Sequence, residues 1–183
     1  FGPMPENLPS EAILPYVKQV STMPNSKVTY TQFTEYLLDD LQQAEQLMKD
    51  KDPICSKSIA ELNSTSSDDN FWMYRQMRMN YYAVCATLAR VHLWMGSKSE
   101  ALEYAKKAAD AFPEKHLKVV AFIMKELAYY YDAKKEYDKS EALVIEALEI
   151  IERLRKLQPY AYKQIHAQLC QNYSYVLNET NRK

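Results

Sequence analysis

The stretch from Arg78 to Pro113 restricts the fold most, because it predicts two helices joined by one tight turn. Gly96, one of only two glycines in 183 residues, marks the break, and Pro113 marks the end of the second helix. Residues typical of a buried helix face recur at helical spacing on both sides of the break. They are Cys85, Leu88, Ala89, His92, Ala101, Ala105 and Ala108. Since a helical hairpin buries its apolar face against neighbouring hairpins, we expect an all-α chain of stacked hairpins.

The composition agrees with this fold class and disfavours several functions. Two glycines are too few for a sheet with many tight turns or for a glycine-rich phosphate loop. Lys and Arg (23) nearly balance Asp and Glu (24), so no net field favours nucleic acid or an anionic membrane. The three cysteines form no CxxC motif, which indicates neither a disulfide framework nor a thiolate metal site. No apolar run reaches the roughly 18 residues of a membrane span.

The order of elements follows from proline, capping and loop signals. Recurring prolines predict an extended arm over residues 1–28, and a helix over 31–49 follows, capped by Thr29 with Gln32 or by Thr31. Residues 50–70 are rich in Ser, Thr, Asn and Asp and predict a loop. Residues 29–183 are expected to form a single helical-repeat domain. After the loop it continues with a hairpin over 71–112, a hairpin over 113–158 and a lone helix over 160–177.

Within these hairpins the sequence also predicts particular ends and faces. A helix over 71–95 forms the first half of the first hairpin, and Pro113 is expected as the first residue of the second hairpin, where its missing N–H needs no partner. The helix over 138–158 has a predicted core stripe with Val144 and Ala147 beside it. The stripe consists of Ala142, Ile145, Leu148, Glu149, Ile151, Leu154 and Leu157.

These hairpins resemble the tetratricopeptide repeat. Leu88 and Ala89 fall at the repeat's Leu-Gly positions and His92 falls at its Tyr. Ala101, Ala108 and Pro113 fall at its two alanines and its proline. Repeat starts at Tyr82, Ala121 and Ala167 give similar matches, although they are farther apart than the usual period of about 34 residues. The matching residues of the later repeats are Leu127, Ala128 and Tyr131, then Tyr173, Ser174 and Leu177.

Four segments carry a second resemblance: FGPMP, LPYVKQVST, YLLDDLQQAEQLMKDKDPI and RMNYYAVCATLARVHLWMGSKSEALEYAKKA. In these, residues 1–113 resemble the central part of the SusD/RagB family, the surface glycan-capturing lipoproteins of Bacteroidetes. Residues 114–183 resemble general bacterial tetratricopeptide arrays, in EYDKSEALVIEALEIIERLRKLQPYAYKQIHAQLCQNYSYVLNETNR. Family members are several hundred residues long and carry an N-terminal lipobox and a large C-terminal region. A fusion of two sources and a truncated gene product both remain open.

The SusD/RagB resemblance implies a location and a partner. The helical repeats of that family mainly pack against a TonB-dependent transporter, so the resemblance implies an outer-membrane, cell-surface protein of nutrient uptake. The resemblance implies a scaffold role and no sugar contact for the matching residues. They include Tyr82, Leu88, Ala89, Ala101 and Ala108. A glycan is implied only in the context of the full-length family.

Candidate binding residues come from the tetratricopeptide resemblance, in which positions 5 and 9 of each first helix line a concave groove. Position 5 is Ala86, Lys125 and Gln171, and position 9 is Arg90, Tyr129 and Tyr175, with Trp94 further along. Such a mixture of aromatic, cationic and amide groups can hold a peptide. The sequence therefore predicts a groove formed by Arg90, Trp94, Lys125, Tyr129, Gln171 and Tyr175.

No catalytic apparatus is predicted, and the chain is not expected to be an enzyme. His92, His116 and His166 are far apart, with no HExxH motif, so no metal site is expected. No serine lies in a GxSxG elbow, and no cofactor is indicated. Fifteen tyrosines and two tryptophans could stack on sugar rings, but most of the tyrosines fall where repeat cores are filled.

Three functions stay open at this point. The first is a non-catalytic scaffold resembling part of a SusD-like glycan-uptake lipoprotein, in contact with a transporter partner. The second is a free-standing tetratricopeptide adaptor that binds a peptide in its concave groove, and the third is an oligosaccharide-binding module. A homodimer through the helix over 160–177 is also expected, because a lone first helix leaves a hydrophobic face uncovered.

Overall fold

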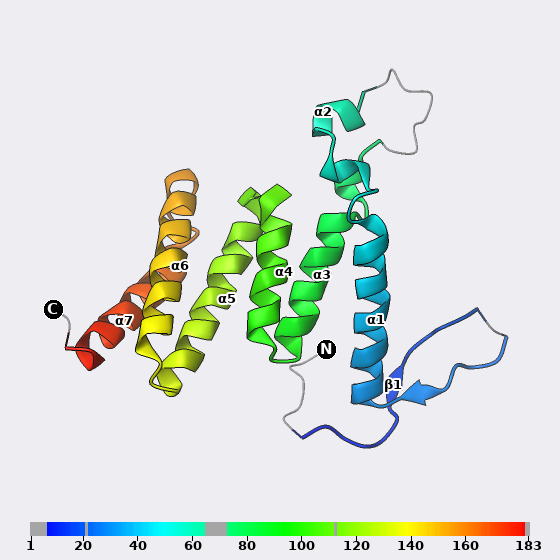
Figure 1. Cartoon of the computed structure of the whole chain (residues 1–183), viewed down its shortest axis with the longest axis horizontal. Coiled ribbons are helices and arrows are strands. Elements are labelled where there is room, and N and C mark those ends of the chain that lie inside the picture. The colour runs from blue at the N-terminus through cyan, green and yellow to red at the C-terminus, as the bar shows by residue number, and fades with distance from the viewer. Residues whose placement is uncertain (1–6, 21, 65–72, 112, 182–183) are drawn as a thin grey trace. The chain divides into compact units, whose positions relative to one another are not determined.

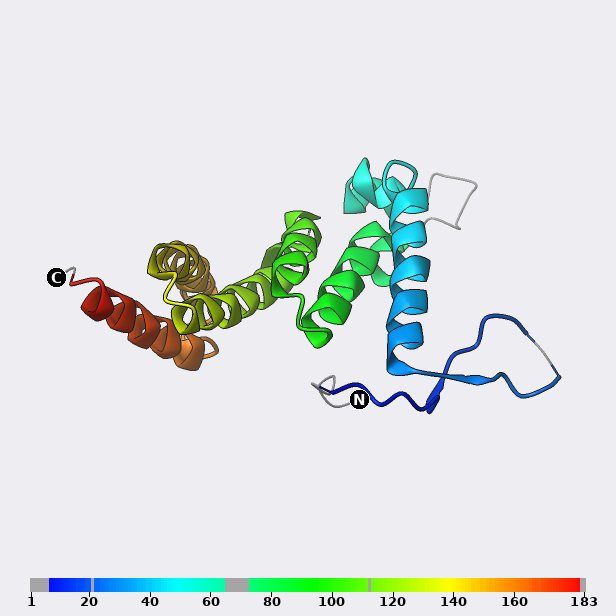
Figure 2. The ribbon, with the colours of Figure 1, turned by 60° about the horizontal axis from the view of Figure 1, so that its bottom comes forward.

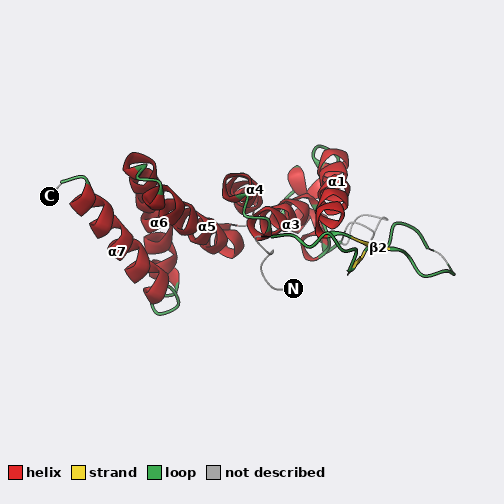
Figure 3. Cartoon of the chain, turned by 90° about the horizontal axis from the view of Figure 1, so that it is seen from below, coloured by secondary structure: helices red, strands yellow, loops and turns green. Residues whose placement is uncertain are grey.

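A computed structural model of the chain describes residues 7–20, 22–64, 73–111 and 113–181. The chain divides into two compact units, residues 1–96 and 97–183, and each is described by itself. The described residues form seven α-helices, two short 3-10 helices and one two-stranded ribbon (Figure 3). The all-α class is therefore confirmed. The boundary between the units falls after Gly96, inside the hairpin that the sequence predicts over 71–112.

Residues 1–96 contain two longer helices that lie side by side, α1 and α3 (Figure 1). Short elements at either end of this pair connect the chain. The elements are β1 (Leu14–Pro15), β2 (Lys27–Val28), α1 (Tyr30–Met48), η1 (Pro53–Cys55), α2 (Ile59–Leu62), η3 (Arg75–Met77) and α3 (Tyr81–Trp94).

The start of α1 follows the capping signal in the sequence. The amide N of Gln32 donates to Thr29 Oγ1 at 3.2 Å, and the amide N of Thr29 donates to Gln32 Oε1 at 3.1 Å. This reciprocal pair satisfies two backbone donors that the first turn would otherwise leave open. The helix begins at Tyr30, one residue before the predicted start.

The predicted extended arm contains a small antiparallel ribbon, in which Leu14 pairs with Val28 and Pro15 with Lys27. The ribbon is fixed to α1 through Tyr16, whose hydroxyl donates to Asp40. The ring of Tyr16 also meets the ring of Phe33 edge-on, with centroids 5.5 Å apart. Aromatic contact and one charge-assisted hydrogen bond therefore hold the arm against the helix.

The helix predicted over 71–95 is wrong at its beginning, because α3 starts only at Tyr81. Residues 73–80 form turns and η3, while Phe71 and Trp72 lie outside the described residues. Asn80 caps α3, since its Oδ1 accepts from the amide N of Ala83 at 2.9 Å. A capping Asn ends the helical pattern on its N-terminal side, which the apolar spacing alone does not reveal.

The predicted loop over 50–70 is partly ordered into short helices. η1 begins after Asp52, and α2 begins after Ser58, which forms its own capping box with Glu61. Residues 65–70 lie outside the described part of the chain. The short helices arise because Asp and Ser side chains, which disfavour helix interiors, are favourable at helix starts.

Residues 97–183 form four helices that follow one another (Figure 2). They are α4 (Lys98–Ala111), α5 (Pro113–Ala133), α6 (Tyr137–Leu157) and α7 (Lys163–Glu179). Pro113 is the first residue of α5, as the sequence predicts. The helix expected from residue 160 starts three residues later.

Side-chain contacts show which of these helices are neighbours beyond the chain order. Lys106 Nζ lies 2.8 Å from Glu146 Oε1, which joins α4 to α6. Asn172 Nδ2 donates to Asp132 Oδ2 at 3.0 Å, which joins α5 to α7. One exposed ion pair thus connects α4 to α6, and a hydrogen bond connects α5 to α7.

The core of this unit contains the small residues of the repeat pattern. Ala101, Ala108, Ala128 and Ala147 are almost completely buried, which allows close approach of the helices. Larger side chains fill the remaining space, and the fully buried ones include Ile123, Met124, Val144, Ile151 and Leu169.

The predicted core stripe of α6 is right at Ile151 and Leu154, which are buried, and wrong along its other edge. Ile145 is 40% exposed and Leu157 is 64% exposed, although both belong to the predicted stripe. The buried face instead runs through Ser140, Val144, Ala147, Ile151 and Leu154. The reason is that α6 packs against both α5 and α7, so its buried face is the one between these neighbours.

Candidate binding sites

The six predicted groove residues lie in two separate units. Arg90 and Trp94 are on α3, within residues 1–96. Lys125 and Tyr129 are on α5, and Gln171 and Tyr175 are on α7, all within residues 97–183. The six residues therefore belong to two sets, one in each unit.

Lys125 is the most constrained of the six, because its side chain is buried although it carries a charge. The residue is 7% exposed, and its Nζ lies 3.1 Å from Glu126 Oε1. Nζ also donates to Gln168 Oε1 of α7 at 3.2 Å. The rings of Phe122 and Tyr129 flank the ammonium, with centroids 5.0 Å and 5.7 Å from Nζ. One carboxylate, one amide and two aromatic faces thus hold the cation in place.

A hollow of about 440 Å³ lies beside Lys125, and we call it the α5/α7 hollow. Its wall combines apolar, amide and cationic groups and includes no carboxylate. Phe122 is 42% exposed there, so an aromatic face is open to a ligand. The lining residues are Lys118, Val119, Phe122, Lys125, Ala161, Tyr162, Gln164, Ile165 and Gln168.

The sequence identified only Lys125 among the residues of this lining. Phe122 could have been found, because positions 122, 125 and 129 are spaced to share one helix face. Gln168 and Tyr162 could not, because their approach to α5 depends on how α6 returns the chain to α7. The predicted position 5 of the third repeat, Gln171, is exposed and does not line the hollow.

Tyr129 and Tyr175 are both partly exposed but have different neighbours. Tyr129 stands next to Lys125, as described above. Tyr175 instead meets the ring of Tyr137 edge-on, with centroids 6.4 Å apart, and Tyr137 donates its hydroxyl to Glu179 Oε2 at 3.2 Å. Partial burial, together with hydrogen bonding to Tyr175 and the nearby Glu179, raises the pKa of Tyr137 to about 12. Tyr175 therefore belongs to a small aromatic cluster at the end of α7.

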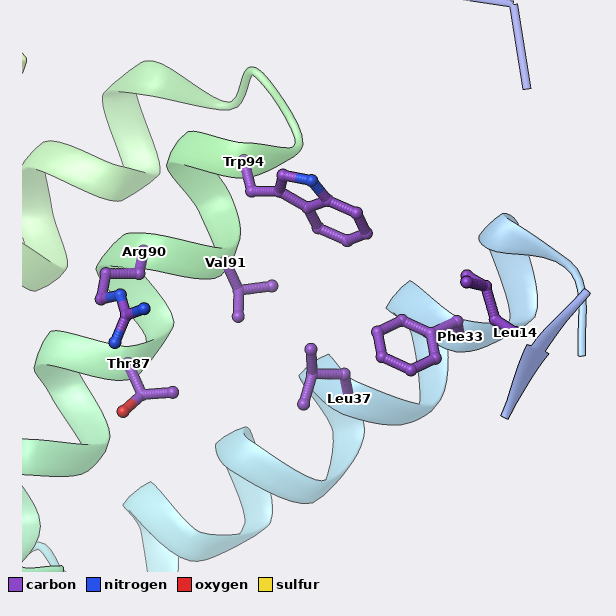
Figure 4. A pocket seen from close by; sticks show the side chains of 7 residues that line it. All are labelled: Leu14, Phe33, Leu37, Thr87, Arg90, Val91 and Trp94. Carbon is purple, nitrogen blue, oxygen red and sulfur yellow. The ribbon is translucent and has the colours of Figure 1, made fainter. Parts of the chain in front are cut away.

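Arg90 and Trp94 line a different hollow, of about 410 Å³, which we call the α1/α3 hollow (Figure 4). Its other lining residues come from α1, from α3 and from the ribbon at β1. They are Leu14, Phe33, Leu37, Thr87 and Val91. Trp94 points into the space between α1 and α3, whereas the exposed Arg90 borders the hollow with its guanidinium turned toward Thr87 (Figure 4).

Within the described part of the chain, no group of three or more His, Cys, Asp and Glu side chains is placed to hold a metal ion. His92 is buried on α3, and His166 lies beside Cys170 on α7, with Nδ1 3.8 Å from Sγ. No helix in the described residues is both long enough and apolar enough to cross a membrane.

Comparison of the chain with protein-family models gave no match. A comparison with curated proteins also gave no match. The resemblances to the SusD/RagB family and to tetratricopeptide arrays therefore enter below as proposals.

Proposed function

We propose that the chain is a non-catalytic helical scaffold that binds another protein, and that the α5/α7 hollow receives a segment of this partner. The observation that carries the proposal is the position of Lys125. A buried ammonium lines an open hollow whose wall includes no carboxylate, directly beside a half-exposed phenyl ring. A site of this kind suits a peptide with an apolar side chain next to an acidic one.

The remaining wall supports a peptide backbone as ligand. Gln164 and Gln168 contribute side-chain amides, which both donate and accept hydrogen bonds. Phe122 and Tyr162 supply flat apolar area at low conformational cost, because an aromatic side chain has few rotatable bonds. Glu126 and Gln168 already fix the Lys125 side chain. Binding of an anionic group therefore costs little additional side-chain entropy at Lys125.

The resemblances extend this proposal to a fold type and a partner. The packing of each helix from α4 to α7 on the next one, the contacts of α5 with α7, and the burial of Ala128 and Ala147 support a tetratricopeptide-like stack. By resemblance of residues 1–113 to the SusD/RagB family, the partner would be a TonB-dependent transporter at the outer membrane. In the alternative of a free-standing tetratricopeptide adaptor, the same hollow would bind a peptide, and only the identity of the partner would differ.

One observation favours the oligosaccharide-binding alternative. Tyr160, at the turn before α7, is 81% exposed, and Lys163 stands over its ring with Nζ 4.6 Å from the centroid. An exposed aromatic face can stack on a sugar ring. Tyr129 and Tyr175 add further exposed rings in the same unit.

Peptide selection from a random 12-residue display library on the immobilised chain tests the proposal. Selected peptides, labelled and titrated by fluorescence anisotropy, should bind the parent chain and lose about tenfold or more in affinity on Lys125→Met, a loss typical of a charge-assisted hydrogen bond. Phe122→Ala should weaken binding as well. The matched control is Lys106→Met, which removes an exposed lysine of α4 outside the hollow.

Circular dichroism of each variant establishes that the helices are retained. Selected peptides that bind Lys125→Met and Phe122→Ala as tightly as the parent chain would refute the proposed site. If no peptide is selected and oligosaccharides bind with a loss on Tyr160→Ala, the oligosaccharide module replaces the protein-binding scaffold.

A further inference from the structure

The α1/α3 hollow has the composition of a small-molecule site, and its lining residues are distant in sequence from those of the α5/α7 hollow. Five of its seven lining side chains are apolar: Leu14, Phe33, Leu37, Val91 and Trp94. Its volume of about 410 Å³ falls within the range of about 300–1,000 Å³ that is usual for ligand pockets. Leu14 comes from β1, so the N-terminal ribbon borders the space between the two helices (Figure 4).

The apolar wall is already arranged by contacts among its own rings. Trp94 meets Phe33 edge-on, with centroids 6.3 Å apart, and tilts against Tyr30 at 6.4 Å. Trp94, Val91, Phe33 and Leu37 point into the space between α1 and α3 (Figure 4). A ligand with an apolar body would gain aromatic and aliphatic contacts there without a large rearrangement.

The lining contains two polar side chains of α3, Thr87 and Arg90, which differ in whether they already have a hydrogen-bond partner. Thr87 Oγ1 already donates to the carbonyl O of Ala83 at 2.8 Å. Arg90 carries the one formal charge of the lining, and no carboxylate pairs with it among the residues that the structure describes. An arginine presents several N–H donors in a planar fork that matches both oxygens of a carboxylate. The exposed Arg90 therefore offers the border of the hollow donors that suit an anion.

We propose that the α1/α3 hollow binds a small organic acid, with its apolar body between Phe33, Leu37 and Trp94 and its carboxylate on Arg90. One cation beside an apolar wall matches a ligand with one negative charge and a hydrophobic remainder. The site is independent of the α5/α7 hollow, because all its lining residues belong to residues 1–96.

Trp94 provides a direct reporter for this proposal. The chain has two tryptophans, so Trp72→Phe leaves Trp94 as the single emitter. The probe is 4-phenylbutyrate, compared with 4-phenylbutanol, which has the same apolar body and no charge. The acid should change Trp94 emission saturably and bind at least about tenfold more tightly than the alcohol, as expected for a hydrogen bond to a charged group.

Substitutions then assign the charge recognition to one residue. Arg90→Gln should reduce the affinity for the acid to that for the alcohol and leave alcohol binding unchanged. Arg78→Gln is the matched control, because Arg78 is an exposed arginine of the same unit that does not line the hollow. Leu37→Gln should weaken acid and alcohol alike, since it makes the apolar wall polar.

Three results would overturn the proposal. The first is the absence of a saturable change in Trp94 emission with 4-phenylbutyrate, while circular dichroism shows a folded chain. The second is equal acid affinity for Arg90→Gln and the parent, or an equal loss for Arg78→Gln and Arg90→Gln. The third is tighter binding of the peptide Ala-Ala-Phe-Leu, through its free C-terminus, than of the small acid. The occupant would then be a protein segment.

Discussion

The carboxylate of Asp52 and the guanidinium of Arg75 form a bidentate ion pair. Arg75 Nε donates to Asp52 Oδ1 at 2.8 Å, and Nη2 donates to Oδ2 at 2.6 Å. The Asp52 side chain is 1% exposed, and it also accepts from the amide N of Ile54 and of Tyr81. One carboxylate therefore contacts η3 and the first turn of α3 as well as its own η1, within the segment that connects α1 to α3.

Removing the charge of Asp52 should destabilise this unit strongly. Asp52→Asn removes the charge that pairs with the largely buried Arg75 guanidinium, for which a loss of about 3 kcal/mol in the free energy of unfolding is expected. Urea unfolding followed by tryptophan fluorescence measures it, because Trp72 and Trp94 both belong to residues 1–96.

The matched control for this experiment is Asp39→Asn, the same chemical change at an exposed position of α1. Asp39 Oδ2 accepts only an exposed hydrogen bond from Gln43, so we expect a change within about 0.5 kcal/mol. Equal unfolding midpoints for Asp52→Asn and Asp39→Asn would show that the ion pair is not important for this unit.

The same pair predicts how the stability depends on pH. Burial raises the pKa of Asp52, but hydrogen bonds from Arg75, Ile54 and Tyr81 outweigh this and hold it below its ordinary value of 3.8. The unfolded chain therefore takes up the proton first as the pH falls, and stability is lost from about pH 4 downward. The stability difference between the parent and Asp52→Asn should be constant near pH 6 and shrink as the pH falls from about 4 to about 3. Urea titrations over this range check it, and a constant difference would contradict the prediction.

Sequence patterns predicted the helices well where the signal was local. The capping pair of Thr29 and Gln32, and Pro113 at the start of α5, placed helix starts to within one residue. The start of α3 was missed although Asn80 caps it locally, and a second contact there is distant in sequence: Asp52 accepts from the amide N of Tyr81 across 29 positions. A contact of that separation leaves no trace in the apolar spacing of residues 71–95.

The candidate sites were predictable only in part, for a related reason. The tetratricopeptide resemblance predicted Lys125 and Tyr129 as groove residues of one helix, and the structure shows them together. The partners from other helices, such as Gln168 beside Lys125 and Phe33 beside Trp94, depend on tertiary packing. A repeat pattern predicts which residues share one face of a helix. Which residues of other helices contact that face is known only from the fold.

The N-terminal ribbon should detach from α1 when Tyr16 is truncated. Burial and the hydrogen bond to Asp40 raise the pKa of Tyr16 to about 12, so at neutral pH its hydroxyl keeps the proton that it donates. Tyr16→Ala removes both this bond and the contact with Phe33, and trypsin should then cleave after Lys18 several-fold faster. Tyr16→Phe keeps the ring and should fall between the two. Cleavage at the parent rate in Tyr16→Ala would exclude Tyr16 as the anchor.

Two alanines of α6 separate the buried face that the structure shows from the one that the sequence pattern predicts. Ala147 is completely buried, whereas Ala142, from the predicted stripe, is exposed. Ala147→Leu should therefore overpack the core and cost about 1–3 kcal/mol in the free energy of unfolding. Ala142→Leu should stay within about 0.5 kcal/mol, since an exposed helical position accepts leucine readily. Urea unfolding followed by circular dichroism compares the two, and the opposite order of midpoints would restore the predicted stripe as the buried face.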